Sequence, residues 1–112
     1  MEHQAIIGVG VDILETKRFS GIRFLSRVVE FFLTSTEIAE FTLHSDPIRY
    51  AASRFALKEA VIKAYPEKLG YHDIEIGKMG VKPNVKIHNL DSNMLVSLSH
   101  STDYVAGFAI AH

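Results

Sequence analysis

One segment limits the possible folds of this chain more than any other: the stretch SDPIRYAASRFALKEAVIKAYP, residues 45–66. Asp46 and Pro47 predict a helix start, because an Asp side chain caps free N–H groups and proline fits the first helical turn. Pro66 predicts the end of the same helix. At about 100° per residue, apolar side chains fall on every side of it. Such a helix is normally buried, so the sequence predicts a fold built around it.

Four charged residues lie within this apolar helix: Arg54, Lys58, Glu59 and Lys63. Glu59 and Lys63 are four residues apart, and most such pairs are surface ion pairs worth a few tenths of a kcal/mol. Here their neighbours are small or apolar, which indicates a poorly solvated face where charge is costly. Arg54 and Lys58 also place two like charges side by side, which is unfavourable without an anion between them. One carboxylate among several cations is typical of a site for a metal ion and phosphate groups.

The segment AIIGVGVDI, residues 5–13, predicts a β-strand with two different faces. Alternate side chains point in opposite directions, so one face is apolar and the other carries Gly8, Gly10 and Asp12. Glycine inside a strand often marks the close approach of another backbone or of a ligand. Asp12 is therefore either a turn or helix-capping residue, or a carboxylate that holds a hard cation beside an open strand face.

The remaining segments predict shorter helices and antiparallel strands. Residues 15–32 predict one helix, or two helices divided at Gly21, and residues 34–41 predict a short helix with the capping-box pair Thr34 and Glu37. Four further strands are predicted, at residues 73–77, 84–88, 95–100 and 104–111. The loop KMGVKP joins the first two, and a hairpin across STD joins the last two. This pattern predicts an α+β fold: a mostly antiparallel sheet packed with a long central helix and shorter helices.

Composition narrows the class of protein. The chain has 112 residues, a net charge of −1 and no cysteine, which fits a single domain over residues 1–112. This balance argues against bulk binding to nucleic acids or membranes, and no apolar run is long enough to span a bilayer. The first residues lack the regions of a signal peptide, so a cytoplasmic location is expected. The charge is not balanced everywhere. Residues 16–29 contain four basic residues and no acidic one: Lys17, Arg18, Arg23 and Arg27.

Hydroxyl groups and an imidazole gather near the end of the chain, in SLSHSTDY at residues 97–104. Turn chemistry by itself explains Ser, Thr and Asp at a hairpin tip. A nucleophilic triad would need a nucleophile-elbow pattern, which the chain lacks. The functional interpretation that fits this composition is phosphate binding by His100 and the neighbouring hydroxyl groups.

Three stretches in order along the chain resemble the holo-[acyl-carrier-protein] synthase family, the small type of 4′-phosphopantetheinyl transferase. They are GVGVDILE, SRFALKEAVIKA and VSLSHSTDYVAGFAIA, and the segments FLTSTE and VKPNVKI add weaker similarity. The likeness covers nearly the whole chain. It implies a 4′-phosphopantetheinyl transferase-like fold, assembled as a homotrimer with active sites between neighbouring subunits.

The resemblance also implies an activity. Enzymes of this family transfer the 4′-phosphopantetheine group of coenzyme A to a serine of apo-acyl carrier protein and release 3′,5′-ADP, for fatty acid biosynthesis. Asp12 and Glu59 match the Mg²⁺ ligands, with Glu59 also a candidate base through a bound water, and Lys63 matches a residue that reaches the pyrophosphate. The implied contacts to coenzyme A are Arg54, Lys58, Lys63, Pro83, His100 and Thr102. The acidic carrier protein would meet the basic cluster Lys17, Arg18, Arg23 and Arg27.

The sequence departs from the family in one segment. Family members commonly have a helix before VSLSH, and here NLDSNM leaves no room for it. A non-catalytic paralogue that binds coenzyme A or a nucleotide is therefore the alternative function. A structural oligomer, in which the charged helix merely forms salt bridges between subunits, is a third interpretation.

Overall fold

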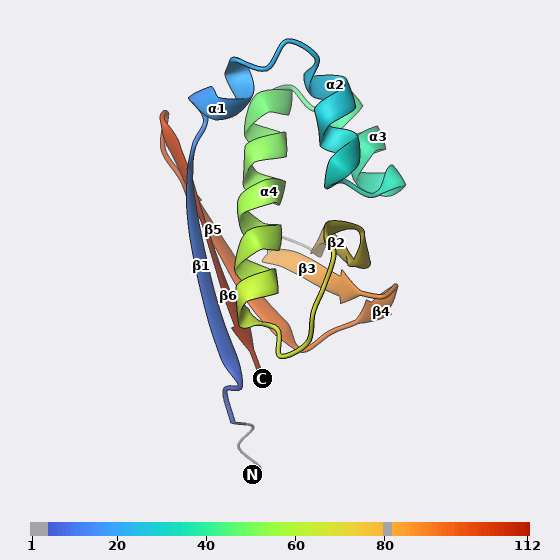
Figure 1. Ribbon diagram of the computed structural model, residues 1–112, viewed down its shortest axis with the longest axis vertical. Helices are drawn as coiled ribbons and strands as arrows, with labels where there is room; N and C mark the ends of the chain where they lie inside the picture. Colours follow the sequence, from blue (N-terminus) through green and yellow to red (C-terminus); the bar gives the residue numbers. More distant parts are fainter. Residues whose placement is uncertain (1–4, 80–81) are drawn as a thin grey trace.

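The computed structural model describes residues 5–79 and 82–112 (Figure 1). Gly80 and Val81, in the predicted loop KMGVKP, lie outside the described residues. The predicted central helix is present as α4, Pro47–Ala64. Its start is capped as expected, because the Asp46 Oδ1 atom accepts a hydrogen bond from the backbone N–H of Arg49 at 3.1 Å. The helix ends two residues before Pro66, so both predicted boundaries are confirmed.

Two antiparallel sheets flank α4. The first has the strand order β1 (Gly8–Glu15), β6 (Tyr104–Ala111) and β5 (Met94–His100). The second has the order β2 (Ile74–Met79), β3 (Lys82–Ile87) and β4 (Leu90–Asp91). Figure 1 shows α4 lying along one face of the first sheet, with the second sheet on its other side. The predicted α+β fold is confirmed, and the strands divide into two sheets.

The glycine face of β1 contacts the backbone of α4. A Cβ atom added to Gly8 would lie 1.7 Å from the carbonyl oxygen of Ala64, and one added to Gly10 would lie 1.9 Å from that of Ala60. Gly107 pairs with Asp12 across β1 and β6, and a Cβ atom added to it would lie 2.7 Å from the carbonyl oxygen of Ala56. Of the two explanations for the strand glycines, close approach of another backbone is therefore correct. This contact fixes the register of Asp12 against the helix.

Short helices cover the end of the molecule near the start of α4 (Figure 1). They are α1 (Lys17–Ser20), α2 (Leu25–Val28), η1 (Val29–Phe31) and α3 (Ser35–Leu43), and η2 (Tyr71–Asp73) precedes β2. A single helix over residues 15–32 is wrong, because β1 extends to Glu15 and α1 ends at Ser20. The alternative of two helices divided at Gly21 is confirmed, since Gly21 is the C-cap of α1 and α2 follows. The predicted capping box of Thr34 and Glu37 is confirmed at the start of α3. Among the described residues, no helix has the length and apolar character needed to cross a membrane.

The segment that departs from the family, residues 89–94, begins in a tight turn. His88 and Asn89 both have positive φ angles, of 53° and 65°, between the paired residues Ile87 and Leu90. Two consecutive left-handed residues are the requirement of a common two-residue hairpin turn. The chain then passes through the short strand β4 directly into β5. The prediction that this segment has no room for a helix is confirmed.

Candidate active site

Asp12 and Glu59 come together although 46 residues separate them in sequence. Because Gly10 faces Ala60 and Gly107 faces Ala56, Asp12 lies beside the turn of α4 that carries Glu59. The hydroxyl of Tyr71 donates a hydrogen bond to the Glu59 Oε1 atom. This hydrogen bond and burial raise the pKa of Tyr71 to about 12, and the charges of Glu59 and Asp12 add to the shift. The hydroxyl of Tyr71 is therefore bound by Glu59 and lies within electrostatic range of Asp12.

Lys63 completes this group one turn further along α4. Its Nζ atom donates hydrogen bonds to the backbone oxygen of Val11 at 2.9 Å and to Asp12 Oδ1 at 3.3 Å. The lysine side chain is about half exposed. This cation thus contacts Asp12 one helical turn after Glu59, at a position that solvent and ligands can reach.

The donor set formed by Asp12 and Glu59 fits Mg²⁺. Mg²⁺ is usually bound by one or two carboxylates, with waters and substrate phosphates as the other ligands. Within residues 5–79 and 82–112, no cluster of three or more His, Asp or Glu side chains could hold a metal. A zinc site needs three or four protein ligands, so it does not fit the described part of the chain.

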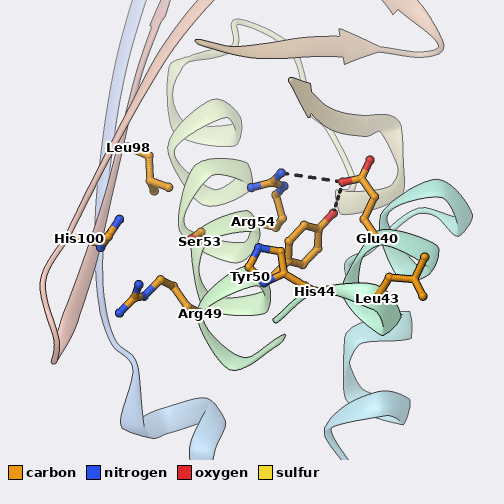
Figure 2. A pocket seen from close by; sticks show the side chains of 9 residues that line it. All are labelled: Glu40, Leu43, His44, Arg49, Tyr50, Ser53, Arg54, Leu98 and His100. Atoms are coloured by element: carbon orange, nitrogen blue, oxygen red, sulfur yellow. Dashed lines mark hydrogen bonds and ion pairs between the residues drawn. The ribbon is translucent and has the colours of Figure 1, made fainter. Parts of the chain in front are cut away.

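A cavity of about 680 Å³ lies between α3, α4 and β5. Figure 2 shows its lining residues: Glu40, Leu43, His44, Arg49, Tyr50, Ser53, Arg54, Leu98 and His100. The guanidinium of Arg54 stacks 4.4 Å from the centre of the Tyr50 ring. Its Nη2 atom lies 3.9 Å from Glu40, and its buried Nε atom has no hydrogen-bond partner among the described residues. The cavity therefore offers unused donors to an anionic ligand.

A smaller cavity of about 210 Å³ adjoins the first, and Arg49 lines both. Thr102 lines the smaller cavity, and its backbone oxygen accepts a hydrogen bond from the Thr16 hydroxyl at 3.1 Å. The predicted phosphate-binding residues Arg54, His100 and Thr102 thus line two neighbouring cavities. Sequence reasoning missed Arg49 and Glu40. No spacing in the sequence pointed to either residue, and both are identified by the cavity that they line.

Comparison with known proteins identifies the family. The model of the 4′-phosphopantetheinyl transferase superfamily matches residues 8–110. The holo-[acyl-carrier-protein] synthase of Thermodesulfovibrio yellowstonii is 35% identical over 114 residues, which cover 94% of this chain and 97% of the relative. The chain belongs to the holo-[acyl-carrier-protein] synthase family. The resemblance inferred from its motifs is therefore confirmed.

Solved structures of holo-[acyl-carrier-protein] synthases have the same fold. The structure from Neisseria meningitidis has a TM-score of 0.85 at 29% identity and covers 96% of this chain and 99% of its own. The structure from Bacillus anthracis was determined in complex with CoA (3′,5′-ADP). It has a TM-score of 0.80 at 28% identity, covering 94% of this chain and 95% of its own. The predicted 4′-phosphopantetheinyl transferase-like fold is confirmed.

Lys58, which the family likeness assigned to coenzyme A binding, lies in the core instead. Lys58 is fully buried, and its Nζ atom donates to Glu37 Oε1 at 2.6 Å and to the backbone oxygens of Phe32 and Tyr71 at 2.6 and 3.1 Å. Burial lowers the pKa of Lys58, and the carboxylate of Glu37 opposes that shift. Because three acceptors use all three ammonium protons, Lys58 has none left for a nucleotide phosphate. We therefore correct its assignment from a ligand contact to a core residue.

Pro83 also lies apart from the cavities described above. It is half-buried in β3, opposite Lys78, within the second sheet. It is not among the residues that line the cavity of Arg54 and His100. Within one chain, the structure does not bring Pro83 to these side chains.

The basic cluster lies at the end of the molecule that holds α1 and α2 (Figure 1). Lys17, Arg18, Arg23 and Arg27 are all exposed. Lys17 pairs with Glu15 at 3.1 Å, and Arg23 lies over the ring of the exposed Phe24. An apolar cavity of about 280 Å³ lies beside this cluster, and its lining includes Arg18, Phe31, Phe55 and Tyr71. Arg18 is the member of the basic cluster that lines this cavity. Exposed charges of one sign suit an acidic protein partner.

Proposed function

We propose that this protein transfers the 4′-phosphopantetheine group of coenzyme A to a serine of apo-acyl carrier protein and releases 3′,5′-ADP. The observation that carries the proposal is the convergence of Asp12 and Glu59 beside Lys63. Family membership and the bound CoA (3′,5′-ADP) of the Bacillus anthracis relative support the choice of donor. The role in the cell would be fatty acid biosynthesis in the cytoplasm.

Each group in the site has a task in this reaction. Asp12 and Glu59 would hold Mg²⁺, which when bound would neutralise charge on the pyrophosphate. Lys63 lies next to Asp12 and would contact the same pyrophosphate. Arg54, His100 and Thr102, with Arg49 between them, would bind the remaining phosphate of the nucleotide.

The chemistry is a displacement at phosphorus that needs no nucleophile from the enzyme. The serine oxygen of the carrier protein forms a bond to the phosphorus next to pantetheine. The bond from that phosphorus to the bridging oxygen breaks, and 3′,5′-ADP leaves with the bond's electrons. The serine proton passes to a base, for which Glu59 acting through a water is our candidate. Catalysis then comes mainly from positioning and from neutralising charge.

The carrier protein would bind at the basic cluster defined by Lys17, Arg18, Arg23 and Arg27. These side chains are exposed, and Arg18 lines the apolar cavity that Tyr71 also lines, so a docked partner would reach the site of Glu59. Exposed charges of one sign mainly accelerate the encounter of two proteins. The proposal therefore includes binding that weakens as salt concentration rises.

A homotrimer with sites between subunits is part of the proposal. The sheet face opposite α4 exposes apolar side chains, each between 40% and 67% accessible: Ile7, Val9, Val11, Ile13, Leu95 and Phe108. Exposed apolar patches commonly mark protein interfaces, and a second copy of the chain is a partner with the same apolar face. Contacts to coenzyme A from a neighbouring subunit would also account for the distance of Pro83 from the cavity of Arg54.

Light scattering tests the trimer. Wild-type protein should have the mass of three chains, and Val11→Lys should dissociate it, because a charge would replace an apolar side chain on the sheet face. Leu90→Lys is the matched control, since Leu90 is 70% exposed but lies on β4 of the second sheet. A monomeric wild type at micromolar concentration would contradict this part of the proposal.

A mass assay tests the transfer itself. Apo-acyl carrier protein is incubated with the protein, coenzyme A and Mg²⁺, and mass spectrometry measures whether it gains one phosphopantetheine. Asp12→Asn and Glu59→Gln should each lower the rate by roughly 10²–10³-fold, the usual loss when one electrostatic group is removed from an active site. Asp91→Asn, on exposed β4, is the matched control and should keep the wild-type rate. Binding of coenzyme A without a gain in mass would instead support the non-catalytic paralogue.

A further inference from the structure

Tyr71 connects the buried core to the carboxylate pair. It begins η2, and its backbone oxygen accepts a hydrogen bond from the buried Lys58 at 3.1 Å. Its ring packs against Phe55 with the ring centres 5.6 Å apart, and its hydroxyl donates to Glu59. Lys58 and Glu59 are neighbours in α4, so one helical turn holds Tyr71 by both its backbone and its side chain. The position of the hydroxyl is therefore fixed from two directions.

Glu59 differs from the other acids near the lysines of α4 in the kind of partner it has. Glu37 pairs with Lys58, and Asp12 pairs with Lys63. Glu59 has no ion pair within the described residues, and its hydrogen-bond partner there is the hydroxyl of Tyr71. A neutral donor orients a carboxylate without cancelling its charge. It also occupies one of the two oxygens, which leaves the other available to a cation.

We propose that Tyr71 is a positioning residue, whose hydroxyl holds Glu59 in the orientation that binds the divalent metal ion together with Asp12. This inference rests on the metal site in the proposed function. Carboxylates that bind metals are commonly held by hydrogen bonds of their own, and the loss of such a partner typically lowers metal affinity 10- to 100-fold. Lys58 contributes indirectly, because its hydrogen bond to the backbone oxygen holds Tyr71 in place.

Tyr71→Phe tests the inference with the smallest possible change. Phenylalanine keeps the ring against Phe55 and the backbone oxygen for Lys58, and it removes only the hydroxyl. Mn²⁺, which replaces Mg²⁺ in many such sites and is visible by electron paramagnetic resonance, serves as the probe. We expect the Mn²⁺ dissociation constant to rise about tenfold. In transfer assays, the Mg²⁺ concentration for half-maximal rate should rise by a similar factor, and the rate at saturating Mg²⁺ should change less.

Two controls separate this role from a general effect on packing. Tyr65→Phe removes a hydroxyl from a half-buried tyrosine just after α4 and should leave Mn²⁺ affinity unchanged. Thermal unfolding in EDTA should give similar midpoints for Tyr71→Phe and Tyr65→Phe. A much larger drop for Tyr71→Phe would assign the hydroxyl to stability and overturn the positioning role.

Asp12→Asn and Glu59→Gln in the same Mn²⁺ titration separate failure of this inference from failure of the proposed function. If neither change weakens Mn²⁺ binding, the proposed metal site itself is wrong. If both weaken it and Tyr71→Phe does not, only the role of Tyr71 is overturned. Tighter Mn²⁺ binding by Tyr71→Phe would also overturn it, because the hydroxyl would then compete with the metal for Glu59.

Discussion

Two pairs of an acid with a lysine from α4 lie in very different surroundings. In the first, Glu37 and Lys58 are both fully buried, with 2.6 Å between Oε1 and Nζ. In the second, Asp12 and Lys63 are 3.3 Å apart, with side chains 20% and 51% exposed. The chemical groups are of the same kind and the two lysines are five residues apart in one helix. Only their surroundings differ.

The buried pair is complete without any ligand. Besides Lys58, Glu37 accepts hydrogen bonds from the backbone N–H groups of Thr34 and Ile76, at 2.9 and 2.7 Å. The exposed pair can still bind a ligand, because Lys63 lies at the surface. A second carboxylate, Glu59, acts on the same Tyr71 hydroxyl as Asp12. The comparison teaches that a charged side chain whose hydrogen bonds are all made within the protein holds structural elements together. A charged side chain that is partly exposed can still bind a ligand. Four substitutions test that division.

The largest effect is expected from Lys58→Met. Removal of one partner leaves the Glu37 charge buried and unpaired, which typically costs about 3–5 kcal/mol. The free energy of unfolding, measured by urea denaturation, should fall by that amount. A loss below about 1 kcal/mol would show that the buried pair contributes little, and the contrast between the two pairs would then fail.

Lys63→Met is the same substitution at the exposed pair. It should affect the transfer rate strongly and the free energy of unfolding weakly. An exposed ion pair contributes about 0–1 kcal/mol, so the free energy of unfolding should hardly change. The transfer rate should fall roughly 10²-fold, because the variant loses the cation that we propose contacts the pyrophosphate. A variant with reduced stability and a normal rate would reverse our assignment of the two lysines.

Gly10→Ala should disturb the exposed pair through the backbone. The added methyl group would lie 1.9 Å from the Ala60 oxygen, so β1 must move away from α4, at a cost of about 1–3 kcal/mol. Asp12 moves with the strand, and Mn²⁺ binding should weaken as well. Gly77→Ala is the matched control, since no atom lies within 4 Å of the added Cβ. Equal effects of the two changes in denaturation and in Mn²⁺ titration would contradict this account.

The smallest effect is expected from Glu40→Gln. Arg54 and Glu40 form an intermediate case, in which the cation is buried and the acid is about half exposed, 3.9 Å apart. Without the carboxylate, Arg54 should attract a phosphate more strongly, and calorimetry should show a few-fold tighter binding of coenzyme A. Dephospho-coenzyme A, which lacks the 3′-phosphate, should show no such gain. An equal gain for both ligands would mean that Arg54 does not contact that phosphate.

Much of the fold could be predicted because it depends on near neighbours in sequence. Asp46 and Pro66 set the ends of α4, and the alternation of residues 5–13 set the two faces of β1. The start of the first helix, predicted at residue 15, was harder to place, and α1 begins at Lys17 instead. The reason is that β1 extends to Glu15 through its pairing with Tyr104, which is a contact between distant segments.

The candidate site could be predicted in part. The glycines beside Asp12 and the four-residue spacing of Glu59 and Lys63 were visible as local patterns, and the structure brings these three residues together. Tyr71 was missed, because no pattern in sequence connects it to Glu59. Arg49 and Glu40 entered only through the shape of the cavity.

The sequence by itself determined which segments form the long helix and the strands, and which side chains could carry charge into the interior. Only the tertiary structure decided which of these charges is satisfied. Lys58 finds its partner 21 residues away in α3, and Glu59 finds the hydroxyl of Tyr71 12 residues away. Helix periodicity fixes the direction of a side chain, whereas its solvation and its partners depend on segments that fold against it.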